Sequence, residues 1–146
     1  MNNISTLYGV ILSAGKGSRL QGKIKALLKI GNKTFIEKII SNFRKFKIKN
    51  ITIVLGYKAH LVKKYLKEKK IIKRQMSLNP ALSGKTFTPP LHAGVGFRKS
   101  GVNVLVNRNY NSQQLTSLKL AVKNLPSHCA GIIFTPVDHP MVKLST

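Results

Sequence analysis

Short apolar runs alternate with segments of helical periodicity along this chain. Four runs rich in branched aliphatic residues are predicted to be strands, at residues 9–12, 50–55, 102–107 and 130–135. Apolar residues at helical spacing predict three helices, one after Thr34, one after Tyr57 and one over residues 115–125. Because strand and helix alternate, the sequence predicts an α/β fold with a mainly parallel sheet.

The predicted helices have distinct inward faces. Thr34 is expected to cap the first helix, with Glu37 at the capping-box position. Apolar side chains expected in the core follow on this helix, at Phe35, Ile36, Ile39, Ile40, Phe43 and Phe46. The second helix is expected to turn inward Leu61, Val62, Tyr65 and Leu66, and the third Leu115, Leu118, Ala121, Val122 and Leu125.

The periodicity stops over residues 74–101, where prolines and glycines recur without a helical or strand pattern. A connection of this length without regular structure is uncommon inside a compact domain. We therefore expect an insertion here. A disordered insertion is favoured over a lid above the site, and a stretch foreign to the domain is the third alternative.

The length of 146 residues allows one domain with a substantial core, predicted over residues 1–146. No apolar run approaches the length needed to cross a bilayer, and the first residues lack the basic region of a secretory signal. The single cysteine, Cys129, excludes an internal disulfide and a multi-cysteine metal site. We expect a cytoplasmic protein without a membrane partner.

The chain is strongly basic, with 26 lysines and arginines against Glu37, Glu68 and Asp138, for a net charge of +23. Such an excess attracts polyanions, nucleic acid and nucleotides included. The basic residues are spread along the chain without interleaved aromatic residues, so we expect nucleic acid to bind only non-specifically. A dedicated nucleic-acid-binding module is kept as an alternative.

A glycine-rich turn directly follows the first predicted strand. Gly15 and Gly17 allow backbone N–H groups to approach an anion such as a polyphosphate, and Arg19 and Lys25 add positive charge nearby. The spacing matches neither a Walker A loop nor the dinucleotide fingerprint. An ordinary surface turn with basic neighbours is the alternative interpretation.

Asp138, the only aspartate, follows the last predicted strand, which we expect to be buried. Ligand sites in open α/β sheets gather at the carboxyl ends of the strands. A carboxylate there can hold a divalent cation, which prefers hard oxygen ligands. A turn or capping role for Asp138 is the alternative.

Residues 12–20 (LSAGKGSRL), 25–28 (KALL) and 31–33 (GNK) resemble the opening of the sugar-phosphate and cofactor nucleotidyltransferases. Residues 107–110 (NRNY), 116–118 (TSL) and 136–140 (PVDHP) narrow the resemblance to the MobA-like NTP transferases. That family includes the molybdenum-cofactor guanylyl- and cytidylyltransferases. The resemblance covers residues 9–70 and 102–142.

The resemblance implies a three-layer, Rossmann-like nucleotidyltransferase fold of the glycosyltransferase-A-like kind. It implies a nucleotide site formed by Leu12, Ala14, Gly15, Gly17, Ser18 and Ser117. By the same resemblance Arg19 and Lys25 are the catalytic residues that meet the phosphates, and Asp138 holds Mg²⁺.

The implied reaction transfers a nucleoside monophosphate from an NTP, CTP or GTP foremost, to a small anionic acceptor with release of pyrophosphate. The acceptor is a phosphorylated compound or a cofactor, as in molybdenum cofactor biosynthesis. Family members continue past the Asp-x-Pro motif, so we expect a fold incomplete at the C-terminus and self-association through the last strand. A catalytically inactive NTP-binding fragment is the alternative to an active enzyme.

Overall fold

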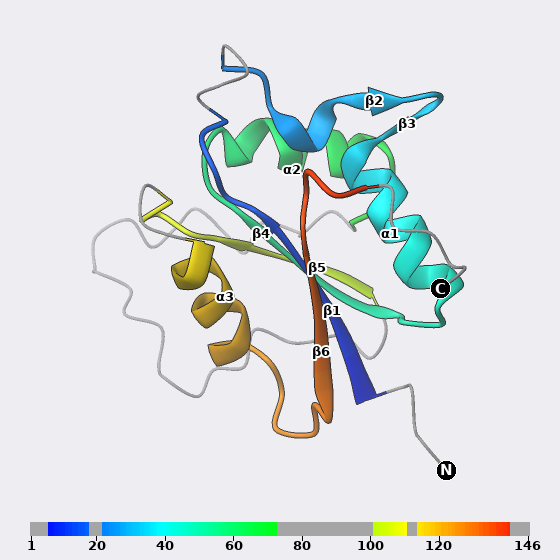
Figure 1. The fold of residues 1–146 in the computed structure, drawn as a ribbon, viewed down its shortest axis with the longest axis vertical. Coiled ribbons are helices and arrows are strands. Elements are labelled where there is room, and N and C mark those ends of the chain that lie inside the picture. The colour runs from blue at the N-terminus through cyan, green and yellow to red at the C-terminus, as the bar shows by residue number, and fades with distance from the viewer. Residues whose placement is uncertain (1–5, 18–21, 73–100, 111–113, 141–146) are drawn as a thin grey trace, which may run out of the picture.

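A computed structural model describes residues 6–17, 22–72, 101–110 and 114–140 (Figure 1). Its main sheet contains β1 (Leu7–Ser13), β4 (Asn50–Leu55), β5 (Gly101–Val106) and β6 (Gly131–Pro136). The strand order is β5-β4-β1-β6, and all three neighbouring pairs are parallel. The prediction of a mainly parallel sheet is confirmed. Residues 74–100 of the expected insertion lie outside the described residues.

Helices cover both faces of the sheet, which gives three layers (Figure 1). On one face α1 (Phe35–Lys45) and α2 (Ala59–Glu68) pack in one core cluster with Ile11, Ile51 and Ile53. On the other face α3 (Gln114–Lys123) places Ala121 against Val10. Because β1 and β4 are buried on both faces, apolar side chains predominate on both, although β4 also buries the polar Asn50 and Thr52.

The packing of α1 against β1 depends on the absence of a side chain at Gly9. A Cβ atom at Gly9 would lie 2.9 Å from Cδ2 of the buried Phe43 ring. Real Cβ atoms do not approach aromatic carbons this closely, so the ring occupies the space that a side chain would need. Gly9 therefore sets how near the first helix lies to the sheet.

The start of α1 has the capping box that the sequence predicts. The Glu37 backbone N–H donates to Thr34 Oγ1 at 3.4 Å, and the Thr34 backbone N–H donates to Glu37 Oε2 at 2.8 Å. Tyr65 Oη on α2 donates to the same carboxylate oxygen at 2.9 Å, which joins the two helices. Burial acts to raise the pKa of Glu37, but these hydrogen bonds outweigh it and hold the pKa below its ordinary value.

Three short elements lie between β1 and α1, and the sequence analysis did not anticipate them. A 3₁₀ turn, η3 (Lys25–Leu27), is followed by an antiparallel pair of strands, β2 (Lys29–Ile30) and β3 (Lys33–Thr34). Gly31 has a φ of +59° between these strands, in the left-handed region that glycine tolerates best. The pair leads directly into the capped start of α1 (Figure 1).

Several expected core positions are exposed instead, and those predictions were wrong. Helical side chains predicted to point inward reach solvent at Phe46, Leu61, Leu115 and Val122. The last strand, β6, is not buried either, because it forms an edge of the sheet with a neighbour on one side only. Its Ile133 and Phe134 side chains are 47% and 51% exposed. Within the described ranges, no helix has the length and apolar character needed to cross a membrane.

Candidate functional site

A pocket lies at the carboxyl ends of the central strands. The chain runs outward from β1 to β4 and β5 on one side, and β6 then joins the other side of β1. A crevice at such a change of direction is where ligands bind in open parallel sheets. The pocket is lined by Leu12, Ser13, Gly15, Gly17, Ile24, Lys25, Tyr57, Gln114, Val137 and Asp138.

Backbone hydrogen bonds hold the turn after β1 to its neighbours. The Tyr57 N–H, just past β4, donates to the Ala14 carbonyl at 3.1 Å, and the Val137 N–H, just past β6, donates to the Leu12 carbonyl at 3.0 Å. Three strand ends are therefore joined around one loop. This arrangement positions the loop before any ligand arrives.

Gly56 and Gly17 make this loop geometry possible. A Cβ atom at Gly56 would lie 2.5 Å from the Ala14 carbonyl oxygen and 2.4 Å from Tyr110 Cβ, so only glycine fits there. Gly17 has a φ of +61°, in the left-handed region that favours glycine. The Lys25 side chain runs alongside it: a Cβ atom on Gly17 would lie 3.8 Å from Lys25 Cγ and 3.9 Å from Lys25 Cε.

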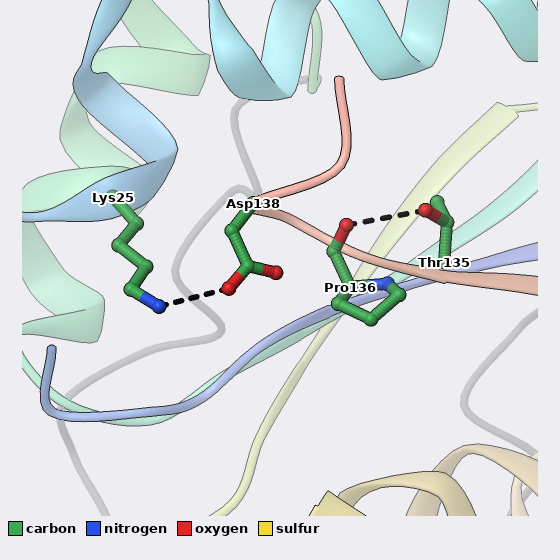
Figure 2. A network of polar contacts seen from close by, with 4 residues as sticks. All are labelled: Lys25, Thr135, Pro136 and Asp138. Carbon is green, nitrogen blue, oxygen red and sulfur yellow. Dashed lines mark hydrogen bonds and ion pairs between the residues drawn. The ribbon is translucent and has the colours of Figure 1, made fainter. Parts of the chain in front are cut away.

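Lys25 and Asp138 meet in this pocket, although they are 113 residues apart in the sequence (Figure 2). Lys25 Nζ donates to Asp138 Oδ2 at 2.9 Å, and the two side chains are 35% and 40% exposed. This is the one salt bridge among the residues that the structure describes. The hydrogen bond from Lys25 holds the pKa of Asp138 below its ordinary value, although partial burial opposes this.

The structure brings five of the predicted residues together around the pocket: Leu12, Gly15, Gly17, Lys25 and Asp138. Ala14 is adjacent, and Ser18 and Arg19 lie outside the described residues. Ser117, placed near the base by resemblance, is buried on α3, where its hydroxyl accepts a hydrogen bond from Asn107 Nδ2 at 3.0 Å.

The sequence analysis did not assign Tyr57 and Gln114 to the site. Tyr57 carried a usable signal, since it comes directly after the strand Asn50–Leu55 and Gly56, where ligand sites gather. Its ring lies 6.1 Å from that of Tyr110, measured between centroids, so Tyr57 lines the pocket with a second aromatic ring packed beside it. Gln114, at the start of α3, had no comparable signal.

The oxygen donors of the pocket fit a divalent cation only in part. Asp138 is the only carboxylate that lines the pocket, and among the described residues no three His, Cys, Asp or Glu side chains form a metal-binding group. Magnesium is commonly bound through one or two carboxylates together with substrate phosphates and water. The donor set therefore fits a cation that takes most of its ligands from a bound nucleotide.

A glycine turn, a lysine and a carboxylate at the switch point of a parallel sheet define a nucleotide-binding α/β domain. The sequence agrees with this class. The chain belongs to the MobA-like NTP transferase domain family, whose sequence profile matches residues 9–146. The family resemblance seen in the sequence motifs is thereby confirmed.

Related sequences include the bifunctional protein GlmU of Wigglesworthia glossinidia brevipalpis. It is 40% identical over 147 residues, which cover 94% of this chain and 30% of that protein. The bifunctional protein GlmU of Acholeplasma laidlawii is 38% identical over 63 residues, or 42% of this chain and 14% of that protein. The chain therefore spans less than a third of these relatives.

Solved structures share the fold. Rv0371c from Mycobacterium tuberculosis superposes with a TM-score of 0.62 at 21% identity, over 93% of this chain and 54% of that one. Its manganese complex gives 0.58 at 20% identity, over 93% and 52%. A nucleotidyl transferase from Methanothermobacter, Mth528, gives 0.59 at 20% identity, over 93% and 52%. The chain spans about half the length of these proteins, and its nucleotidyltransferase fold is confirmed.

Proposed function

We propose that this chain provides the NTP-binding part of a nucleotidyltransferase. In the proposed reaction an acceptor oxygen attacks the α-phosphorus of an NTP, the bond to the bridging oxygen breaks, and pyrophosphate leaves. The observation that carries the proposal is the meeting of Lys25 and Asp138 beside the glycine turn. Fixed positive charge and an oxygen ligand for a cation lie together where parallel sheets bind phosphates.

Each residue has a distinct part in this proposal. The backbone N–H groups of the turn at Gly15 and Gly17 are proposed to bind the phosphates, and Lys25 to neutralise negative charge that develops during transfer. Arg19, which follows the turn in the sequence, is proposed to assist Lys25. Asp138 is proposed to hold Mg²⁺, which when bound supplies charge neutralisation at the phosphate oxygens.

The substrates form the finer part of the proposal. We propose CTP or GTP as the nucleotide and a small anionic acceptor, on the basis of the motifs at residues 107–110, 116–118 and 136–140. The molybdenum-cofactor type of acceptor is proposed on the same basis, and a phosphorylated sugar is the main competitor. An acceptor that is already anionic needs no general base, so this proposal leaves Asp138 free to hold the cation.

Calorimetric titration with CTP, GTP, ATP and UTP, each with and without Mg²⁺, tests the proposal. We expect at least one Mg²⁺–NTP complex to bind, and Lys25→Ala to weaken that binding by about tenfold or more, as expected for loss of a charge-assisted hydrogen bond. Lys119→Ala, which removes an exposed charge from α3, is the matched control and should bind like the wild type. A folded protein that binds none of the four nucleotides would refute the proposal.

A further inference from the structure

In the nucleotide-free protein the cation at Asp138 is the ammonium group of Lys25. The distance of 2.9 Å between Lys25 Nζ and Asp138 Oδ2 is that of a direct, charge-assisted hydrogen bond (Figure 2). The bond uses one of the three ammonium donors and the Oδ2 oxygen of the carboxylate. The two groups proposed for two different ligands, a metal ion and a phosphate, are joined before either ligand is present.

A divalent cation cannot simply be added to this pair. It would have to share the carboxylate with an ammonium group of the same sign, and the repulsion between the two is strong at such short range. Among the described residues that line the pocket Asp138 is also the only carboxylate, so no second carboxylate among them offsets that repulsion. A metal ion arriving alone therefore competes with Lys25 for the carboxylate.

A triphosphate removes this obstacle. The Lys25 side chain already runs alongside Gly17, so the ammonium lies close to the turn proposed to bind phosphates. Phosphate oxygens there can accept the hydrogen bond that Asp138 accepts in the free protein. The released carboxylate then becomes available to a cation, which the phosphates also help to bind.

We infer that Lys25 blocks the metal position at Asp138 until a nucleoside triphosphate draws it away, so that cation and nucleotide bind with strong positive coupling. This inference rests on the proposed function. By linkage, the metal ion must strengthen nucleotide binding by the same factor as the nucleotide strengthens metal binding. A direct consequence is that removing the positive charge of Lys25 should tighten metal binding in the absence of nucleotide.

Manganese is a suitable probe, because bound Mn²⁺ can be distinguished from free Mn²⁺ by electron paramagnetic resonance. The variants are Lys25→Met, which keeps an unbranched side chain one atom shorter but removes its charge, and Lys25→Arg, which keeps the charge. Lys29→Met is the matched control, since Lys29 is an exposed lysine on the adjacent β2. It corrects for the general effect of removing one positive charge.

For Mn²⁺ alone we expect Lys25→Met to bind about tenfold more tightly than Lys29→Met, within the usual range of coupling between sites. Lys25→Arg should bind Mn²⁺ as weakly as the wild type. For CTP and GTP, the gain in affinity between EDTA and saturating Mn²⁺ should be large in the wild type and reduced in Lys25→Met. In Asp138→Asn the protein carboxylate is removed, so the gain in nucleotide affinity that remains comes from Mn²⁺ held by the nucleotide phosphates only. Circular dichroism verifies that each variant is folded.

The outcomes separate the inference from the function beneath it. Equal Mn²⁺ affinities in Lys25→Met and Lys29→Met would overturn the inference even if Mn²⁺–NTP binds well. The same holds if the wild type shows no more coupling than Asp138→Asn. If the wild type binds none of CTP, GTP, ATP and UTP under any condition, the proposed function is wrong, and the inferred coupling fails with it.

Discussion

Replacing Gly56 by alanine should damage both the stability of the domain and the shape of the site. The added methyl carbon would lie 2.5 Å from the Ala14 carbonyl oxygen and 2.4 Å from Tyr110 Cβ. Non-bonded carbon atoms prefer separations of about 3.5–4.0 Å, so a shift of about 1 Å is required. The Ala14 carbonyl cannot yield freely, because it accepts the hydrogen bond from the Tyr57 N–H.

The expected cost follows from two effects. Overpacking of a closely packed site costs about 1–3 kcal/mol. Weakening the hydrogen bond between Tyr57 and Ala14 adds about 0.5–1.5 kcal/mol. We therefore expect Gly56→Ala to lose about 1.5–4.5 kcal/mol of unfolding free energy, a large part of the roughly 5–15 kcal/mol of a typical domain.

Urea denaturation followed by circular dichroism measures this loss as a lower midpoint with an unchanged slope. Gly15→Ala is the matched control, because a Cβ atom at Gly15 would meet nothing within 4 Å. It should unfold like the wild type while placing a methyl group on the lining of the pocket. A Gly56→Ala protein within about 0.5 kcal/mol of the wild type would show that β4 does not approach the loop so closely.

Three further predictions concern other parts of the molecule. Glu37→Gln should lower the unfolding free energy by about 1 kcal/mol near neutral pH. Because folding lowers the pKa of Glu37, this contribution is present above the unfolded-state pKa and is lost as the pH falls through the folded-state pKa. Urea denaturation should therefore show a smaller difference between Glu37→Gln and the wild type at about pH 3 than at about pH 7. Phe134→Lys should reduce self-association in sedimentation velocity, since it places a charge on the exposed apolar edge strand β6; unchanged association would exclude this edge. Because the net charge is +23, oligonucleotides should bind non-specifically with a steep salt dependence, and Lys25→Ala should leave this dependence almost unchanged. Release of the oligonucleotide by Mg²⁺–NTP would instead place its binding site in the nucleotide pocket.

Local patterns in the sequence were sufficient for the main elements of the fold. The predicted strand at residues 50–55 coincides with β4, and the capping box at Thr34 and Glu37 forms as expected. These signals are local because strand periodicity and helix caps depend on neighbours a few residues away. The glycine turn after β1 and the position of Asp138 after β6 were predictable for the same reason.

The sequence alone could not decide which apolar residues are buried. Ile133 and Phe134 have the composition of a buried strand, but β6 lies at an edge, and strand order depends on contacts between distant segments. Likewise, Leu115 and Val122 fit a helical stripe, yet α3 packs against the sheet through a narrower face that includes Ala121. Helical periodicity shows which side of a helix is apolar, but it does not show how much of that side the sheet covers.

The sequence by itself determined the alternation of strands and helices, the glycine turn, and the two charged residues of the site, Lys25 after β1 and Asp138 after β6. It assigned Lys25 to phosphates and Asp138 to a metal ion as separate groups. Only the tertiary structure placed their charged atoms 2.9 Å apart, because β1 and β6 pair as parallel neighbours although most of the chain lies between them. That contact is a property of strand order, which short-range sequence patterns do not encode.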